Sequence, residues 1–202
     1  SSNEWSLIER SAENNIPKLI STGGKSLDSI DKIVSFFSHK KQNFALMHCI
    51  SIYPTPSDEM QLGFLKTLKD RYPKVEIGWS THEDPNDYDI IKIAYSIGAK
   101  IFERHVGLSN EKISLNKYSS TPRQIEEWIQ SFFKTKSIIG SENKIVSDNE
   151  IKSLSNLKRG IYFKNDLKKN QVIKENDIFF AIPYHESQFE SGEWSKGLIL
   201  KK

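Results

Sequence analysis

The segment EIGWSTHEDPNDYDIIKIAYSIGAKIFERHVGL, residues 76–108, decides the fold that we predict for this chain. A short apolar strand over 75–80 leads through a polar loop into a helix, and a second strand follows over 100–106. The helical spacing of apolar residues stops at Gly98. Two strands of one sheet that are joined through a single helix must be parallel. The loops after both strands therefore open at the same edge of the sheet.

One histidine follows each of these two strands, His82 after the first and His105 after the second. Neighbouring strands lie roughly 4.8 Å apart, so two imidazoles at adjacent carboxyl ends can reach one ion. The pair predicts a divalent-metal site, against the alternative of two hydrogen-bonded rim residues. Glu83 and Asp84 would add carboxylate ligands that suit Mg or Mn, unless they serve the loop and cap the next helix.

The rest of the first 140 residues repeats the strand-then-helix pattern. Four such units in succession favour a parallel α/β architecture, either a doubly wound sheet or half of an eight-stranded barrel. In both cases the functional loops gather at the carboxyl ends of the strands. The predicted strands are 18–21, 44–49, 75–80 and 100–106. Helices are predicted from Trp5, after the cap Ser26, from Ser57, over the apolar stripe Ile90 to Ile97, and with Pro122 in the first turn.

The loops at these carboxyl ends hold the unusual residues of the chain. Tyr53 and the serines are candidates for substrate contacts, although they are also common turn formers. His48 has two open interpretations, a site residue or a hydrogen-bonded strand residue. The full set is Ser21, Thr22, His48, Ser51, Tyr53, Ser80, His82, Glu103 and His105.

Composition indicates an ordinary globular protein. The chain has 202 residues, of which 37% are hydrophobic, enough for a substantial core. Its 29 basic residues are nearly balanced by 26 acidic ones and are scattered, which argues against nucleic-acid or membrane-surface binding. With Cys49 as the single cysteine and no apolar run near 20 residues, a cytoplasmic location is expected. Because Ser1 opens the chain within a helix–strand connection, we expect an upstream part of a larger protein to be missing.

The pattern changes near residue 140. Residues 141–156 are polar and helix-poor, as in a linker, and residues 157–202 contain short β-like segments and turns. We therefore expect a small, partial β-rich module after the α/β part.

Several motifs in their order resemble one family. ISTGG (20–24), LMHCISIYPTP (46–56), GWSTHED (78–84) and GAKIFERHVGL (98–108) resemble the carboxyl-terminal half of the (β/α)8 TIM barrel of the sialic acid (N-acetylneuraminate) synthase family. The similarity spans about residues 5–140. The variants STHEDP, ERHVGL and NKYSSTP resemble the branch of spore coat polysaccharide biosynthesis protein E, and DLKKNQVIKENDI (166–178) is similar to the SAF (antifreeze-like) module that follows this barrel.

The resemblance implies an activity. Members condense phosphoenolpyruvate with an amino-sugar aldehyde to a nine-carbon 2-keto-3-deoxy acid and release phosphate, in surface polysaccharide biosynthesis. It also implies roles for residues of this chain: His82 and His105 as catalytic ligands of Mn or Mg, Ser21 and Ser80 at the phosphoenolpyruvate, Ser51, Tyr53 and Asn116 at the sugar. A homodimer is expected for the full-length protein.

The sequence departs from the family in the loop after His105, which reads Ser114-Leu115-Asn116-Lys117-Tyr118 where sialic acid synthases have an Asp-His pair. The arginine that the SAF module supplies to a partner falls near Ile182. The phosphate-binding lysines belong to the first half-barrel, outside these residues. Two other classes stay open, a different metal-assisted barrel aldolase or isomerase and a non-catalytic sugar-binding descendant.

Overall fold

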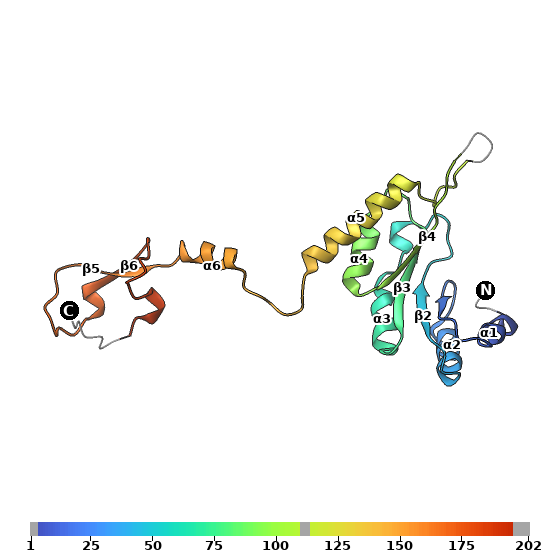
Figure 1. The fold of residues 1–202 in the computed structure, drawn as a ribbon, viewed down its shortest axis with the longest axis horizontal. Coiled ribbons are helices and arrows are strands. Elements are labelled where there is room, and N and C mark those ends of the chain that lie inside the picture. Colours follow the sequence, from blue (N-terminus) through green and yellow to red (C-terminus); the bar gives the residue numbers. More distant parts are fainter. Residues whose placement is uncertain (1–3, 110–113, 196–202) are drawn as a thin grey trace. The chain divides into compact units, whose positions relative to one another are not determined.

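The computed structural model describes residues 4–109 and 114–195, and the chain separates into two compact units at Gly140. The first unit alternates strands and helices (Figure 1). Its elements are α1 (Trp5–Ser11), β1 (Lys18–Ser21), α2 (Leu27–His39), β2 (Phe44–His48), α3 (Gly63–Arg71), β3 (Glu76–Thr81), α4 (Asp89–Ile97), β4 (Ile101–Arg104) and α5 (Pro122–Ile139).

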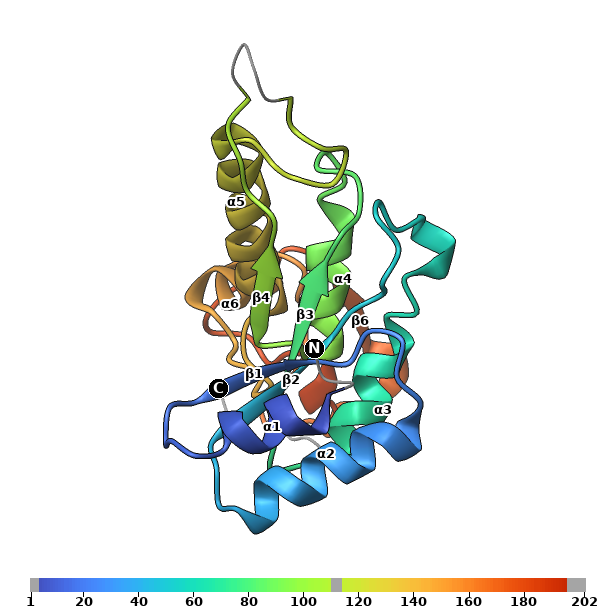
Figure 2. The same cartoon turned by 90° about the vertical axis from the view of Figure 1, so that its right-hand side faces the viewer.

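The four strands of this unit form one parallel sheet in the order β1-β2-β3-β4. A doubly wound sheet reverses its strand order at a switch point, whereas a barrel keeps neighbours in sequence as neighbours in space. The sheet is thus a parallel half-barrel, as in part of a TIM barrel, and the predicted α/β class is confirmed. In Figure 2 the arrows of β3 and β4 lie side by side and point the same way.

Local signals explain where the helices begin and end. The Oγ atom of Ser26 accepts a hydrogen bond from the backbone N–H of Ser29 and so caps α2. Thr121 and Gln124 form a capping box at the start of α5, with Pro122 in the first turn. Gly98 ends α4 at φ 112°, a left-handed conformation that favours glycine.

The hydrophobic core lies between one face of the sheet and the helices. Leu46 of β2, Ile30 of α2 and Leu68 of α3 are wholly buried there, each worth about 1.5–3 kcal/mol relative to an exposed side chain. The opposite face is exposed at the edge strand, where Leu19 of β1 is 59% exposed, but Met47 of β2 is buried on it. Successive side chains of a strand point to opposite faces, so each strand contributes side chains both to the core and to the opposite face.

Several predicted boundaries were wrong. The helix expected over 57–72 is a 3-10 turn at Ser57–Glu59 followed, after a break, by α3. Gln61 in that break has a φ of 48°, which an α-helix cannot accommodate. The strands expected over 44–49 and 100–106 are shorter, since β2 ends at His48 and β4 at Arg104.

The second unit begins with an unexpected helix. The polar residues 141–156, predicted to be helix-poor, contain α6 (Asp148–Ser155), whose first turn is capped by Ser147. The expected β-rich character is present in β5 (Gly160–Phe163) and β6 (Ile178–Ala181), which pair antiparallel. The predicted module extends to 202, and residues 196–202 lie outside the described part. Across the described residues, no helix combines the length and apolarity that crossing a membrane requires.

Candidate active site

The predicted histidine pair meets at the open edge of the half-barrel. His82 follows β3 directly and His105 follows β4, and these strands are paired in register through Ser80 and Glu103. The two ring centroids lie 5.3 Å apart. Both rings therefore lie on one rim of the sheet, as a parallel crossover predicts.

His82 is buried, and its orientation is fixed by two hydrogen bonds. Its Nδ1 donates to the carbonyl oxygen of Ile50 at 3.1 Å, and its own carbonyl accepts from the backbone N–H of Thr55 at 2.9 Å. With Nδ1 engaged, Nε2 carries the lone pair, which is the usual arrangement of a metal-binding histidine. Burial lowers the pKa of His82, so its ring is neutral at neutral pH, as a ligand must be.

Two tyrosines complete an aromatic cluster around the pair, which we define as Tyr53, His82, His105 and Tyr118. The Tyr53 ring lies 4.3 Å from His82, and Tyr118 lies 5.2 Å from both Tyr53 and His105. Tyr118 meets His82 and His105 edge-on, at interplanar angles of 87° and 88°. Three loops that are distant in sequence thus converge on one point. Tyr53 was a sequence candidate, whereas Tyr118 was noted only as part of a divergent loop.

The serine candidates lie along the open face next to this cluster. Ser80 is buried on β3 and donates a hydrogen bond to the carboxylate of Glu103 on β4. The Oγ atom of Ser21 lies 2.8 Å from Sγ of Cys49, at the ends of β1 and β2. Ser51 lies close by, because a side chain at Gly23 would meet its Oγ at 2.5 Å. A glycine is needed at position 23 for these two loops to approach.

Asn116 has a local contact. Its Oδ1 accepts a hydrogen bond from the backbone N–H of Tyr118 at 3.2 Å, a turn that presents the Tyr118 ring. Direct contact between Asn116 and substrate stays a prediction. Part of the same loop, residues 110–113, lies outside the described residues.

Glu83 and Asp84 point away from the histidines and serve structure. Glu83 forms a buried ion pair with Arg104, from Oε1 to Nη1 at 2.5 Å. Asp84 accepts from the backbone N–H of Asn86 at 2.8 Å and so shapes the loop. Asp84 thus serves the loop, as the alternative interpretation expected, but neither carboxylate caps α4, whose first turn has no side-chain cap. The buried ion pair of Glu83 matches neither interpretation. Arg104 was missed by the sequence reasoning, although strand alternation places it opposite to Glu103 and His105.

The histidine pair fits a divalent ion only as part of a larger ligand set. Two imidazoles with centroids 5.3 Å apart and Nε2 of His82 available suit an ion about 2.1 Å from each ring nitrogen. Within 4–109 and 114–195, no three or more His, Cys, Asp and Glu side chains gather as a metal cluster. An ion held by these two histidines alone would keep coordination positions for water or other ligands.

His48 is a structural residue. It is buried on the helix-covered face, its Nε2 donates to the carbonyl of Gln61 at 3.2 Å, and its ring contacts Trp79 and Phe64. Burial lowers its pKa. Of its two interpretations, the hydrogen-bonded strand residue is correct.

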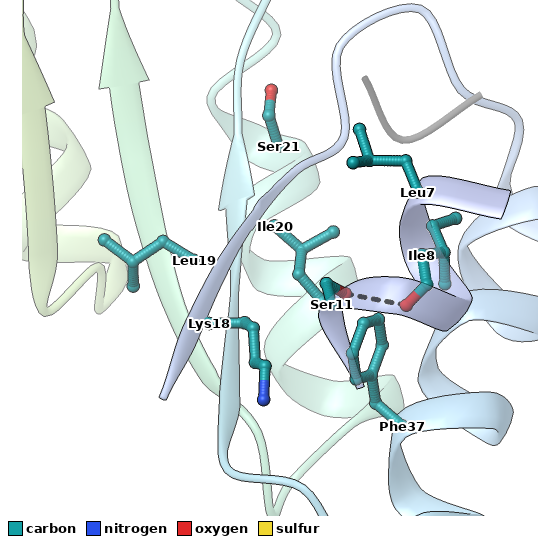
Figure 3. A pocket seen from close by; sticks show the side chains of 8 residues that line it. All are labelled: Leu7, Ile8, Ser11, Lys18, Leu19, Ile20, Ser21 and Phe37. Carbon is teal, nitrogen blue, oxygen red and sulfur yellow. Dashed lines mark hydrogen bonds between the residues drawn. The ribbon is translucent and has the colours of Figure 1, made fainter. Parts of the chain in front are cut away.

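An apolar cavity of about 270 Å³ lies elsewhere, between α1 and the side of β1 that is not paired with β2 (Figure 3). Ile20, Leu7, Ile8 and Phe37 supply most of its wall. Ser21 is the one predicted site residue among those that line it. The cavity is therefore separate from the aromatic cluster.

Comparison with known proteins identifies the family, because the model of the NeuB family matches residues 1–144. The chain belongs to the NeuB family. It is 35% identical over 126 residues to an N-acetylneuraminate-9-phosphate synthase of Drosophila melanogaster, covering 61% of this chain and 33% of that protein. It is 26% identical to an N,N'-diacetyllegionaminic acid synthase of Campylobacter jejuni, over 85% of this chain and 52% of the relative.

Solved structures agree with this family assignment. The spore coat polysaccharide biosynthesis protein E of Chromobacterium violaceum matches with a TM-score of 0.84 and 34% identity, over 100% of this chain and 64% of that one. An N-acetylneuraminic acid synthetase of Leptospira borgpetersenii matches with a TM-score of 0.68 and 26% identity, over 76% and 53%. The chain spans about a third of the length of the Drosophila synthase and about half of the length of the Campylobacter synthase. The predicted resemblance to sialic acid synthases and to the spore coat branch is confirmed.

Proposed function

We propose that this NeuB-family chain is the part of a metal-dependent synthase that positions the aldehyde substrate. The complete protein would condense phosphoenolpyruvate with an amino-sugar aldehyde to a nine-carbon 2-keto-3-deoxy acid. A bond forms between C3 of phosphoenolpyruvate and the aldehyde carbon, water adds at C2, and the C–O bond to phosphate breaks. The products of its relatives, N-acetylneuraminate 9-phosphate and diacetyllegionaminic acid, support this chemistry.

The observation that carries the proposal is the geometry of His82. A neutral, buried imidazole with Nδ1 held by Ile50 directs Nε2 to the rim where His105 also ends. These two residues would hold Mn or Mg, which as a Lewis acid polarises the aldehyde oxygen. Tyr53 and Tyr118 would close the sides of the site with their rings and orient the sugar. Such orientation of two reactants contributes a large share of the rate in bimolecular reactions.

The serines would bind the other substrate. Ser21 and Ser80 lie at the carboxyl ends of β1 and β3. The hydroxyl of Ser80 donates to Glu103, so it would have to turn from that carboxylate to donate to a carboxylate or phosphate oxygen of phosphoenolpyruvate. Ser51 and Asn116 would serve the sugar side. The β5–β6 hairpin unit would be the start of a SAF module, and the complete protein would work as a homodimer.

Phosphate release provides the test. The full-length protein that contains this chain should release phosphate only when phosphoenolpyruvate, an amino-sugar aldehyde and Mn²⁺ are all present. An aldolase or isomerase would convert the sugar without releasing phosphate, and a sugar-binding descendant would bind without turnover. Either result would reject the proposal.

A further inference from the structure

One ion pair of this chain differs from the others in its burial. The side chains of Arg104 and Glu83 are 2% and 1% exposed. In every other ion pair of the described residues, both side chains are at least 33% exposed. The Arg104–Glu83 pair therefore needs its own explanation.

The position of the Arg104–Glu83 pair suggests an explanation for its burial. Glu83 is the next residue after His82, and Arg104 immediately precedes His105. Because neighbouring side chains in extended chain point to opposite faces, the ion pair lies on the helix-covered face directly behind the two histidines. It joins the ends of the two strands at the point where each histidine leaves the sheet.

Arg104 also holds the loop that returns from β4. Its Nε donates to Oγ of Ser120 at 2.5 Å, and Nη2 donates to the carbonyl of Asp84 at 3.3 Å. Ser120 in turn donates its backbone N–H to the carbonyl of His105 at 2.9 Å. Tyr118, whose ring contacts His105, is two residues before this anchor. One guanidinium thus links His82, His105 and Tyr118 through their neighbours in the chain.

Stability alone does not account for such a pair. Desolvation of two charges offsets most of their attraction, and apolar side chains of similar size often stabilise a core as well or better. Glu83 even leaves Oε2 buried without a hydrogen-bond partner in the described part of the chain. Apolar contacts do not fix the orientation of the groups that they join. The planar guanidinium does, because its N–H donors point in fixed directions.

We propose that Arg104 and Glu83 are positioning residues that set the separation and orientation of His82 and His105 and hold Tyr118 against them. The inference rests on the proposed function in one respect, since it takes the histidine pair as the place where the divalent ion binds. Arg104 and Glu83 do not contact the ion themselves. They fix the backbone next to His105 and His82, and so the positions of the two rings.

The test compares Arg104→Lys and Glu83→Gln with Arg71→Lys. Arg71 also pairs with a carboxylate, donating from Nε and Nη2 to Asp31, but this ion pair is exposed and lies at the end of α3, away from the histidines. Titration of Mn²⁺ alone into each folded protein by calorimetry should show affinity about 10–100-fold weaker for Arg104→Lys and Glu83→Gln, the range typical of outer-shell partners. Arg71→Lys should bind as the parent chain does.

A second readout works without metal. Nuclear Overhauser contacts between ring protons of His105 and Tyr118, whose centroids lie 5.2 Å apart, should weaken in Arg104→Lys and Glu83→Gln and persist in Arg71→Lys. Unchanged contacts and unchanged Mn²⁺ affinity in both rim variants would overturn the inference and leave the proposed function intact. A parent chain that binds no Mn²⁺ would reject the metal site instead, and the ring contacts would still decide the role of Arg104. If Arg104→Lys does not fold, the near-isosteric Glu83→Gln decides by the same two measurements.

Discussion

His82 and Tyr53 lie with their ring centroids 4.3 Å apart, although one follows β3 and the other belongs to the loop after β2. The backbone N–H of Thr55 donates to the carbonyl of His82, which fixes the two loops together. The Tyr53 ring therefore covers one side of His82.

Removing either histidine should abolish tight metal binding. We expect His82→Ala and His105→Ala to lose more than the roughly 10–100-fold in Mn²⁺ affinity that outer-shell changes cost, because in the proposed site each would remove a direct ligand. His39→Ala on α2 is the matched control, since His39 is exposed and far from the rim. Calorimetric titration measures all three. Equal affinity in the His82 and control variants would show that the ion binds elsewhere.

Thermal stability should fall in mildly acidic solution because of His48. Burial lowers the pKa of His48 in the folded state, while in the unfolded chain it returns to its ordinary value near 6.5. The unfolded state then binds more protons below that pH, so this stability is complete above pH 6.5 and decreases as the pH falls through it. Burial lowers the pKa of His82 as well, which acts in the same direction.

The corresponding measurement is the Tm between pH 7.5 and 5.5. His48→Gln should reduce the slope of Tm against pH, and His82 should account for part of the remaining slope. His39→Gln should keep the slope of the parent protein. A slope that is identical in the parent and in His48→Gln would refute the assignment.

The loop with Tyr118 should determine which aldehyde is used. Sialic acid synthases have an acidic and an imidazole group where this loop has Leu115, Asn116 and Tyr118. A site with hydrogen-bonding groups that a substrate leaves unpaired discriminates by roughly 10⁴ or more. We therefore expect the full-length protein to prefer another amino-sugar aldehyde over N-acetylmannosamine, as scored by phosphate release on a panel of aldehydes with Mn²⁺. The highest catalytic efficiency with N-acetylmannosamine would contradict this expectation.

Tyr118 itself can be separated from the rest of the loop. Tyr118→Ala removes the ring that meets both histidines edge-on and should raise KM for the aldehyde more than KM for phosphoenolpyruvate. Tyr118→Phe retains the ring and serves as the matched variant, which isolates the contribution of the hydroxyl. Equal changes in both KM values would argue against a sugar-side role.

The 202-residue chain alone should not turn over. Transfer and release of a phosphate need positioned positive donors, and the guanidinium of Arg104 at this rim is already bound to Glu83. β1 is an edge strand that has β2 as its one neighbour among the described strands, and edge strands of this kind promote association. We expect no phosphate release and concentration-dependent association of the chain alone in sedimentation. Synthase activity from these 202 residues would disprove the first expectation.

The sequence by itself determined the order of strands and helices, because apolar periodicity, capping residues and glycine are local signals. The first strand and the start of α2 and α5 match the structure. The histidine pair was also predictable, since the parallel crossover fixes the edge at which both strands end. Local signals failed at Gln61, whose positive φ interrupts the helix expected after residue 57.

Only the tertiary structure decided which side chains meet. Tyr118 joins the histidines through a loop that turns back and is held at Ser120, a contact that no sequence spacing reveals. The sequence left open whether Glu83 is a metal ligand. In the structure its side chain is buried in an ion pair with Arg104. Sequence fixes short-range geometry, whereas packing between distant segments selects the partners of each charged or aromatic side chain.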